Sequence, residues 1–427
     1  MLNFLYLEIY RLIYPICVML IKVLAPYNPK LKKGVRMREN VNRVPPWLNF
    51  SDLENPILIH CASGEFEYAK PVIREIKKRN PNQAIAVSYF SPSYEGQIKN
   101  FEGIDFSCPL PWDLPHVQRE FLAKLRPKQI LISRTDLWPE FLVQAKAFRI
   151  PIIIFSAMLS PHSSKVQNFF LRSYHRWLYS FIFHIYCATE DDKRVFSQFL
   201  SPSRITAIGD TRFDQTLYRL SKPNYLKDYL VGKREDRRAP TFIAGSTWNE
   251  DEKEIIPVMK DLIRAGIKVM IAPHEPTTDH VLRLKAKISQ SGVRPILYSE
   301  ANEWKPNQVL IIDQLGILAD LYAFADWAFV GGSFKKQVHS VMEPLAQGCK
   351  TFFGPYHFNN REALMFQRIN NYAVPVNSGL EMAQLIIKNK NMDTSETFRE
   401  SLKTAVIARA GASERLVLAL IKPTTHF

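Results

Sequence analysis

The feature that most constrains this chain is a pattern that occurs several times along the sequence. In each case a short apolar run is followed by a turn of small polar residues and then by a helical pattern, and Asp326–Pro355 shows this most clearly. An apolar run at Trp327–Val330 leads into the turn Gly331–Ser333, a helical pattern restarts at His339, and a second apolar run follows at Thr351–Phe353. A short apolar run without polar alternation is typical of a strand that is covered on both faces. The pattern therefore predicts parallel strands joined by helices, which is the α/β class.

The turn Gly331–Ser333 and the helix expected from His339 also indicate where an anion could bind. Glycines such as Gly332 let the backbone approach a ligand closely, and the unpaired N–H groups that open a helix favour a phosphate. The expected helix carries Glu343. An ordinary turn between a strand and a helix explains these residues equally well, so both interpretations stay open.

The same pattern recurs on both sides of the charged segment Ser221–Pro240, which holds Lys233, Arg234, Arg237 and Arg238. The strands expected before that segment are 57–60, 84–88, 128–133, 151–156, 182–188 and 205–208, and those expected after it are 241–244, 268–272, 309–312, 327–330 and 351–353. We therefore expect two Rossmann-like domains, each with a parallel sheet, and we expect functional loops at the carboxyl ends of the strands.

These boundaries divide the 427 residues into four predicted parts. They are a membrane anchor with a basic linker (1–40), a first Rossmann-like domain (41–222), a second Rossmann-like domain (239–410) and a C-terminal helix that packs back on the first domain (411–427). Two Rossmann-like domains that face each other across a central cleft form the GT-B arrangement of glycosyltransferases. GT-B is the fold that we expect.

The charge balance indicates an anionic partner. The chain has 56 Lys and Arg residues against 41 Asp and Glu residues, a net charge of +15, which suits a nucleic acid, a phosphorylated substrate or a membrane surface. The basic residues are dispersed and form no recognisable nucleic-acid motif, so nucleic acid is the least favoured partner. The five cysteines are scattered without metal-ligand spacing, which is typical of reduced thiols in the cytosol.

The N-terminal segment Phe4–Leu24 is largely apolar and aromatic, and Glu8, Arg11 and Lys22 interrupt it. It barely reaches the roughly 20 apolar residues that a membrane span needs, and its charges suit a helix lying in the membrane interface better. A buried N-terminal helix of a soluble protein is the alternative. The basic residues that follow suit anionic lipid headgroups and would keep the rest of the chain on the cytoplasmic side of the membrane. They are Lys30, Lys32, Lys33, Arg36 and Arg38.

Glu65 is the strongest candidate for a catalytic group. It follows a strand and the small residues Ser63 and Gly64, and it opens a helix, so a rigid element would hold its carboxylate at a strand end. A glutamate in that place can act as a general base toward an acceptor hydroxyl. The alternative is that the helix dipole simply favours an acidic residue in the first turn.

Polar residues also follow the neighbouring strands. In the first half, Asp136 could cap the helix after Trp138, and Ser156 opens a loop that basic residues follow. In the second half, Ser246 and Thr247 offer hydroxyl groups suited to a phosphate or carboxylate. Another strand ends at Pro273 and His274. The sequence contains no metalloprotease, Walker A or nucleophile-elbow motif, and it predicts no metal and no cofactor.

Taken in order, these strand-end motifs resemble those of the 3-deoxy-D-manno-octulosonic acid (Kdo) transferases of lipopolysaccharide synthesis. The matching stretches are His60-Cys61-Ala62-Ser63-Gly64-Glu65, Asp136-Leu137-Trp138-Pro139, Ser156-Ala157-Met158-Leu159-Ser160, Gly209-Asp210-Thr211-Arg212-Phe213-Asp214, Gly245-Ser246-Thr247, Ala272-Pro273-His274-Glu275, Val330-Gly331-Gly332-Ser333 and His339-Ser340-Val341-Met342-Glu343-Pro344. Each motif is short, but their order and spacing are specific, and together they cover nearly the whole chain.

The resemblance implies transfer of Kdo from CMP-Kdo to a hydroxyl of a lipid A precursor, with inversion at the anomeric carbon. It assigns Glu65 as the general base and Glu343 as the partner of the ribose hydroxyls. The residues implied to bind the nucleotide sugar are Ser246, Thr247, Pro273, His274, Gly331, Gly332, Ser333, His339, Ser340 and Glu343. Those implied to line the acceptor side of the cleft are Ser63, Gly64, Asp136, Ser156 and Arg212.

The chain departs from the family pattern in three places. Met158 stands where the family has an arginine, Ser340 stands where it has an asparagine, and Lys335–Val338 replaces a glycine-rich loop. Two other functions therefore stay open: a transferase of the same fold with another nucleotide sugar or lipid acceptor, and a membrane-bound lipopolysaccharide-binding relative without catalysis.

Overall fold

The computed structural model describes residues 2–43, 54–222, 226, 239–336, 338–358 and 360–421. The chain forms two compact units, one of Met1–Gln215 with Ala410–Phe427 and the other of Thr216–Arg409. The basic residues 233, 234, 237 and 238, expected in the charged segment between domains, lie outside the described residues.

The first unit contains a seven-stranded parallel sheet in the order β3-β2-β1-β4-β5-β6-β7. The strands are β1 Ile57–Cys61, β2 Ile85–Tyr89, β3 Phe106–Pro109, β4 Gln129–Ser133, β5 Ile152–Ala157, β6 His184–Cys187 and β7 Ile205–Ala207. Strand β1 lies at the centre, where Ile57 is paired with Ile85 on one side and with Gln129 on the other. The carboxyl ends of β1, β4 and β5 therefore meet at one edge of the sheet.

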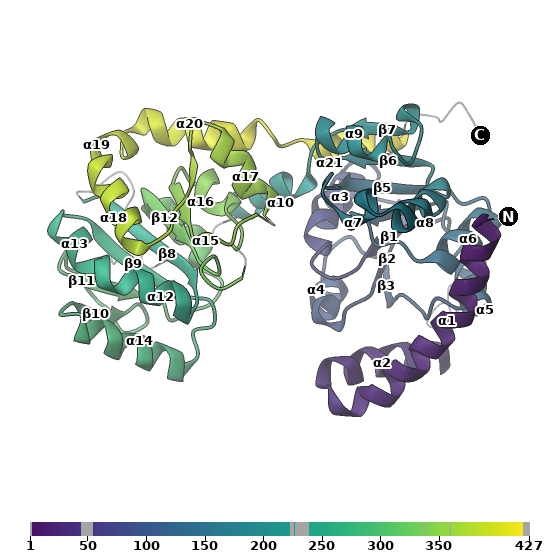
Figure 1. Cartoon of the computed structure of the whole chain (residues 1–427), viewed down its shortest axis with the longest axis horizontal. Helices are drawn as coiled ribbons and strands as arrows, with labels where there is room; N and C mark the ends of the chain where they lie inside the picture. Colours follow the sequence, from purple (N-terminus) through teal and green to yellow (C-terminus); the bar gives the residue numbers. More distant parts are fainter. Residues whose placement is uncertain are drawn as a thin grey trace. The chain divides into compact units, whose positions relative to one another are not determined.

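Helices cover both faces of this sheet (Figure 1). They are α3 Phe66–Arg79, α4 Glu95–Lys99, α5 Pro115–Leu125, α6 Pro139–Ala147, α7 Ser164–Gln167, α8 Phe169–Ser180, α9 Glu190–Phe196 and α21 Ala412–Ile421. Helix α10 (Thr211–Leu220) belongs in part to each unit, because the boundary between the units falls after Gln215. Successive strand residues alternate between the two cores: Leu58 packs with Phe121 of α5, whereas Ile59 packs with Val72 of α3 and Leu416 of α21. The apolar runs are uninterrupted because both faces of the strands are buried.

The second unit contains another seven-stranded parallel sheet, in the order β10-β11-β9-β8-β12-β13-β14. The strands are β8 Thr241–Thr247, β9 Lys268–Pro273, β10 Arg294–Leu297, β11 Gln308–Ile311, β12 Trp327–Val330, β13 Lys350–Phe353 and β14 Ala373–Pro375. The prediction of two parallel-sheet α/β domains is thus confirmed. Side chains again alternate between two cores, with Phe242 on one face and Ile243 on the other.

The helices of the second unit are α12 Asn249–Ile255, α13 Met259–Arg264, α14 Thr278–Gln290, α15 Leu318–Leu321, α16 Met342–Ala346, α17 Arg361–Arg368, α18 Gly379–Lys388, α19 Lys390–Asp393 and α20 Glu396–Ile407. The prediction that a helix restarts at His339 is wrong, because α16 begins at Met342. The backbone of His339 is engaged in loop contacts instead: its N–H donates to the carbonyl of Gly331, and its carbonyl accepts from the Asn360 side chain.

The N-terminal segment forms α1 (Leu2–Leu24), which a short 3-10 turn joins to α2 (Pro29–Arg43). Among the described residues, no helix combines the length and the apolar character that crossing a bilayer requires. One face of α1 packs on the first unit: the Tyr10 hydroxyl donates to Asp113, and Arg11 pairs with Glu140. The other face exposes apolar side chains, including Leu5, Ile9, Leu12, Ile13, Ile16, Met19, Leu20 and Val23.

One of the basic residues expected at lipid headgroups is placed elsewhere. Lys30, Lys32, Lys33 and Arg36 are exposed, but Arg38 is only 3% exposed. Its guanidinium carbon lies 4.1 Å from the ring centre of Phe90 and 5.2 Å from that of Trp112, and it donates to the carbonyl of Phe90. The prediction was therefore wrong for Arg38, which joins α2 to the first unit.

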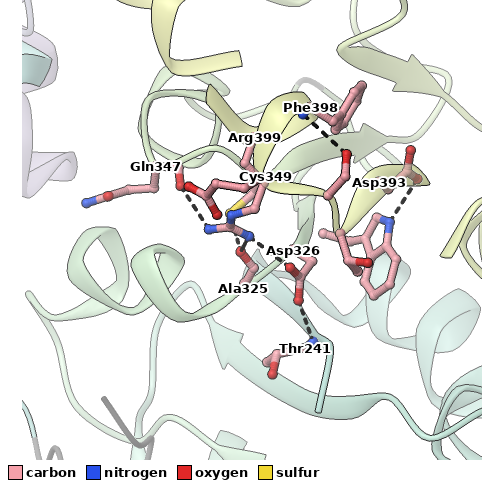
Figure 2. Close-up of polar contacts among 12 residues, drawn as sticks. Thr241, Ala325, Asp326, Gln347, Cys349, Asp393, Phe398 and Arg399 are labelled. Atoms are coloured by element: carbon pink, nitrogen blue, oxygen red, sulfur yellow. Dashed lines mark hydrogen bonds and ion pairs between the residues drawn. The ribbon is translucent and has the colours of Figure 1, made fainter. Parts of the chain in front are cut away.

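A buried carboxylate, Asp326, holds together the amino ends of the central strands of the second unit (Figure 2). Its Oδ2 accepts the N–H of Thr241, the first residue of β8, at 2.9 Å, and its Oδ1 accepts from Nη1 of Arg399 of α20, also at 2.9 Å. Both side chains are at most 1% exposed. Arg399 also donates to the carbonyls of Ala325 and Gln347, which ties the helix to the sheet.

We expect Asp326→Asn to lower the free energy of unfolding of the second unit by about 3–5 kcal/mol, because it leaves the buried Arg399 guanidinium without its counter-charge. Urea denaturation followed by tryptophan fluorescence measures this change. Asp261→Asn is the matched control, because Asp261 pairs with Arg264 on the surface, and such pairs contribute less than about 1 kcal/mol. Equal losses in the two variants would contradict the role given to Asp326.

Candidate active site

Glu65 sits where β1 passes into α3 and is the residue immediately before that helix. Its side chain is half-buried, and its Oε2 accepts the N–H of Ser63 at 2.9 Å. Its carbonyl accepts from the hydroxyl of Ser133, the last residue of β4, at 2.9 Å. No residue that the structure describes forms a hydrogen bond with Oε1 of Glu65, so this oxygen can accept a proton.

Two arginines and a tyrosine lie beside this turn. Nη1 of Arg134 and Nη1 of Arg212 both donate to the Tyr68 hydroxyl, at 3.2 Å and 3.3 Å. The hydroxyl of Ser156 bonds to Thr211 at 2.9 Å, and Thr211 donates to the carbonyl of Tyr68. The loops after β1, β4, β5 and β7 therefore meet through direct hydrogen bonds, and they bring together Ser63, Glu65, Ser156 and Arg212 of the predicted site.

Asp136 has a different role from the helix cap that its position suggested. The residue before α6 is Trp138, which has no side-chain cap, and Asp136 instead accepts from Nε2 of His60 at 2.9 Å and from the Trp138 indole at 3.0 Å. Burial alone would raise the pKa of Asp136, but the hydrogen bond and charge of His60 outweigh it, so this pKa lies below its usual range. Asp136 is therefore an ionised carboxylate that fixes His60.

The second unit holds a cavity of about 310 Å³ at the carboxyl ends of its central strands. Six residues of the predicted nucleotide-sugar site line it: Ser246, Pro273, His274, His339, Ser340 and Glu343. Ser246 has a left-handed φ of 54°, and the pairing of β8 with β9 shifts register around it. Such strain is typical of functional loops and aims the end of β8 at the cavity.

The charged side chains of this cavity form one ion pair. Nη1 of Arg219, from α10, lies 3.0 Å from Oε1 of Glu343, from α16. Both side chains are partly exposed, so the pair can open to admit a ligand. A carboxylate accepts hydrogen bonds from hydroxyl groups, and a guanidinium donates to phosphate oxygens.

The rings of His274 and His339 line the cavity, and the ring of Trp248 stacks on that of His274. The ring centres of Trp248 and His274 are 4.8 Å apart, those of His274 and His339 are 4.5 Å apart, and both pairs are stacked. The Trp248 indole N–H donates to Nε2 of His339 at 3.1 Å, so the neutral His339 ring carries its proton on Nδ1. Burial, together with the neighbouring His274, lowers the pKa of His339 to about 4.

The glycine turn does not supply free N–H groups to a phosphate. The N–H of Gly331 donates to the Gly245 carbonyl, and Asp251 accepts the N–H groups of Gly332 and Phe334. Gly331, Gly332 and Ser333 are absent from the cavity lining. Gly331 is needed for another reason, since a Cβ there would lie 2.2 Å from the carbonyl oxygen of Ser246.

Two other predicted residues also face inward. Ser333 is fully buried, donates to the Val330 carbonyl and accepts the N–H of Gly354, so it closes the turn. Thr247 is fully buried as well and does not line the cavity. These side chains support the loops rather than contact a ligand.

Several cavity residues escaped the sequence analysis. Arg219 comes from a helix more than a hundred residues before its partner Glu343. Gln314–Gly316 follow β11 and Tyr322 follows α15, in both cases without a recognisable motif. The glycine shortly after the end of a strand was a sequence signal for Gly316. No motif in the sequence connects Arg219 with Glu343. Among the described residues, no group of three His, Cys, Asp or Glu side chains could hold a metal ion.

The overall fold is of the GT-B-like α/β class. The crystal structure of UDP-GlcNAc 2-epimerase from Neisseria meningitidis bound to UDP-GlcNAc aligns with a TM-score of 0.58 and 14% identity, covering 86% of this chain and 99% of that chain. At this identity the likeness shows the fold alone, and the fold is shared by enzymes of different chemistry.

Sequence comparisons show which known proteins this chain is similar to. Residues 35–215 match the family model described as 3-deoxy-D-manno-octulosonic-acid transferase (kdotransferase). The 3-deoxy-D-manno-octulosonic acid transferase of Haemophilus influenzae is 26% identical over 446 residues, covering 99% of this chain and 98% of its own length. That of Aquifex aeolicus is 22% identical over 372 residues, covering 85% of this chain and 95% of its own length. The resemblance seen in the motifs is confirmed: residues 35–215 match the Kdo transferase family model, and almost the whole chain is similar to a Kdo transferase.

We expect the imidazole of His339 to stay neutral between about pH 7 and about pH 5.5, because its pKa is lowered to about 4. In an NMR titration, its C2–H resonance, assigned by its loss in His339→Gln, should not shift over this range. The exposed His116 serves as the reference in the same spectra. A midpoint near the ordinary value of about 6.5 would contradict the buried ring stack.

Proposed function

We propose that this protein transfers Kdo from CMP-Kdo to a hydroxyl of a lipid A precursor in lipopolysaccharide synthesis, with inversion at the anomeric carbon. The observation that carries this proposal is the match of almost the whole chain to the Haemophilus influenzae Kdo transferase. The cavity in the second unit supports a nucleotide donor, since its volume of about 310 Å³ lies at the lower end of ordinary ligand pockets.

The donor binds in that cavity. The carboxylate of Glu343 accepts hydrogen bonds from the ribose hydroxyls, and Arg219, which pairs with Glu343 in the structure, donates to the phosphate. Ser246 and His274 supply further donors at the strand ends. Negative charge develops on the phosphate as CMP leaves, and fixed donors lower the energy of that state.

Glu65 is the general base. Its Oε2 is fixed by the N–H of Ser63, and its carbonyl is fixed by Ser133, so the remaining oxygen is held in one direction. Oε1 takes the proton of the acceptor hydroxyl while the hydroxyl oxygen attacks the anomeric carbon of Kdo. The bond from that carbon to the phosphate oxygen breaks and CMP departs, so one displacement inverts the configuration.

The N-terminal helix α1 binds the inner membrane from its cytoplasmic face without crossing it. Its exposed apolar side chains suit the boundary between headgroups and acyl chains, and the exposed Lys30, Lys32, Lys33 and Arg36 of α2 suit anionic lipids. This places the enzyme at the surface that holds its lipid acceptor.

We expect the protein to release CMP from CMP-Kdo when a lipid A precursor is present, and Glu65→Gln to lower kcat about 100-fold or more, because the amide cannot accept the proton. Glu67→Gln is the control: it removes one carboxylate from the same turn, where Glu67 pairs with Lys70, and should change kcat less than about threefold. If Glu65→Gln keeps full turnover, Glu65 is not the base. If the wild type binds the precursor but releases no CMP, the chain is a binding protein.

We also expect Leu12→Glu with Ile16→Glu to reduce binding to phosphatidylethanolamine–phosphatidylglycerol vesicles severalfold in a flotation assay, because charge on the exposed face of α1 opposes burial in lipid. Leu282→Glu, at an exposed position of α14, is the control and should float like the wild type. Unchanged flotation of the double variant would show that α1 is not the membrane contact.

A further inference from the structure

The group of Arg134, Arg212 and Tyr68 in the first unit has an arrangement that helix and sheet formation do not explain. The two guanidinium groups share one acceptor, the Tyr68 hydroxyl. Their central carbons lie 5.3 Å and 5.4 Å from the centre of the Tyr68 ring. Two positive charges are therefore held next to each other by a neutral, buried side chain.

Arg134 makes no ion pair with any described residue, and it is half-buried at the end of β4. An anion placed between two guanidinium groups that are held close together at a partly desolvated site is attracted to both of them. A pair of guanidinium groups also offers several N–H donors in a planar fork, which fits phosphate oxygens well.

The backbone is strained where these side chains project. Arg134 has a left-handed φ of 66°, and Ser156, at the end of the neighbouring strand β5, has a φ of 48°. Residues with a Cβ rarely adopt this conformation, and in folded proteins it concentrates at functional sites. The strain at Arg134 is held in place by its own N–H, which donates to the Phe155 carbonyl.

We propose that Arg134 and Arg212 form a binding site for a phosphate monoester of the acceptor, and that Arg134 determines specificity for a phosphorylated acceptor. The proposal deepens the proposed function and rests on it. A phosphate monoester carries nearly two negative charges at neutral pH, which matches two guanidinium groups better than a single carboxylate does. The carbonyl of Glu65 accepts both from Ser133, the neighbour of Arg134, and from the N–H of Tyr68, so the acceptor phosphate is bound next to the base.

The test compares two acceptors, a tetraacylated glucosamine disaccharide bisphosphate and the same lipid without its phosphates. We expect Arg134→Gln to raise KM for the bisphosphate about tenfold, with KM for CMP-Kdo unchanged, and to leave the dephosphorylated lipid unaffected. Arg134→Lys keeps the charge but loses the fork, and we expect a KM between those of Arg134→Gln and the wild type. Arg119→Gln, at an exposed position of α5, is the control for net charge and should match the wild type.

Binding of the two lipids without donor, measured by calorimetry in detergent, separates this proposal from the proposed function. If the protein shows no turnover with CMP-Kdo, but Arg134→Gln weakens binding of the bisphosphate about tenfold and not that of the dephosphorylated lipid, the phosphate site stands and the donor assignment fails. If turnover occurs and Arg134→Gln changes neither KM nor binding, the phosphate site is refuted. A rise in KM for CMP-Kdo with either acceptor would assign Arg134 to the donor and also overturn the proposal.

Discussion

The second unit depends on one buried carboxylate, that of Asp326, which stands at the start of the strand leading to the candidate nucleotide site. It accepts the N–H of Thr241 at the start of β8 and the guanidinium of Arg399 from α20. A buried charge without a partner is costly, so removing either Asp326 or Arg399 destabilises the amino ends of these strands. Asp326 aligns β8 and β12 at their amino ends. This also aligns their carboxyl ends, which carry Ser246 and the loop before His339.

A second carboxylate, that of Asp251, joins the loops at the carboxyl ends of β8 and β12. It accepts the N–H groups of Trp248, Gly332 and Phe334, so one side chain both caps α12 and closes the glycine turn after β12. The turn therefore supports the loops around the cavity without lining it, and the groups that line the cavity are mainly side chains. Arg219, Glu343 and the stacked rings of His274 and His339 are the groups that a ligand can reach.

The sequence was sufficient to predict the two parallel sheets and the gathering of Ser246, His274, His339, Ser340 and Glu343, because carboxyl ends of parallel strands meet at one edge. It could not show that the N–H groups of Gly331 and Gly332 are already taken, because Asp251 lies eighty residues earlier and looks like an ordinary acid of a first helical turn. The pairs Arg219–Glu343 and Arg134–Tyr68 were missed for the same reason: each joins elements far apart in sequence, and neither belongs to a motif.

Because the fold is shared with a UDP-sugar epimerase, the donor is the central point of this account. The most direct measurement is mass spectrometry of a lipid A precursor after incubation of the whole protein with an equal mixture of CMP-Kdo and UDP-GlcNAc. The account predicts that the lipid gains the mass of Kdo and that UDP-GlcNAc is neither transferred nor epimerised. An unchanged lipid together with consumption of the UDP-sugar would contradict it.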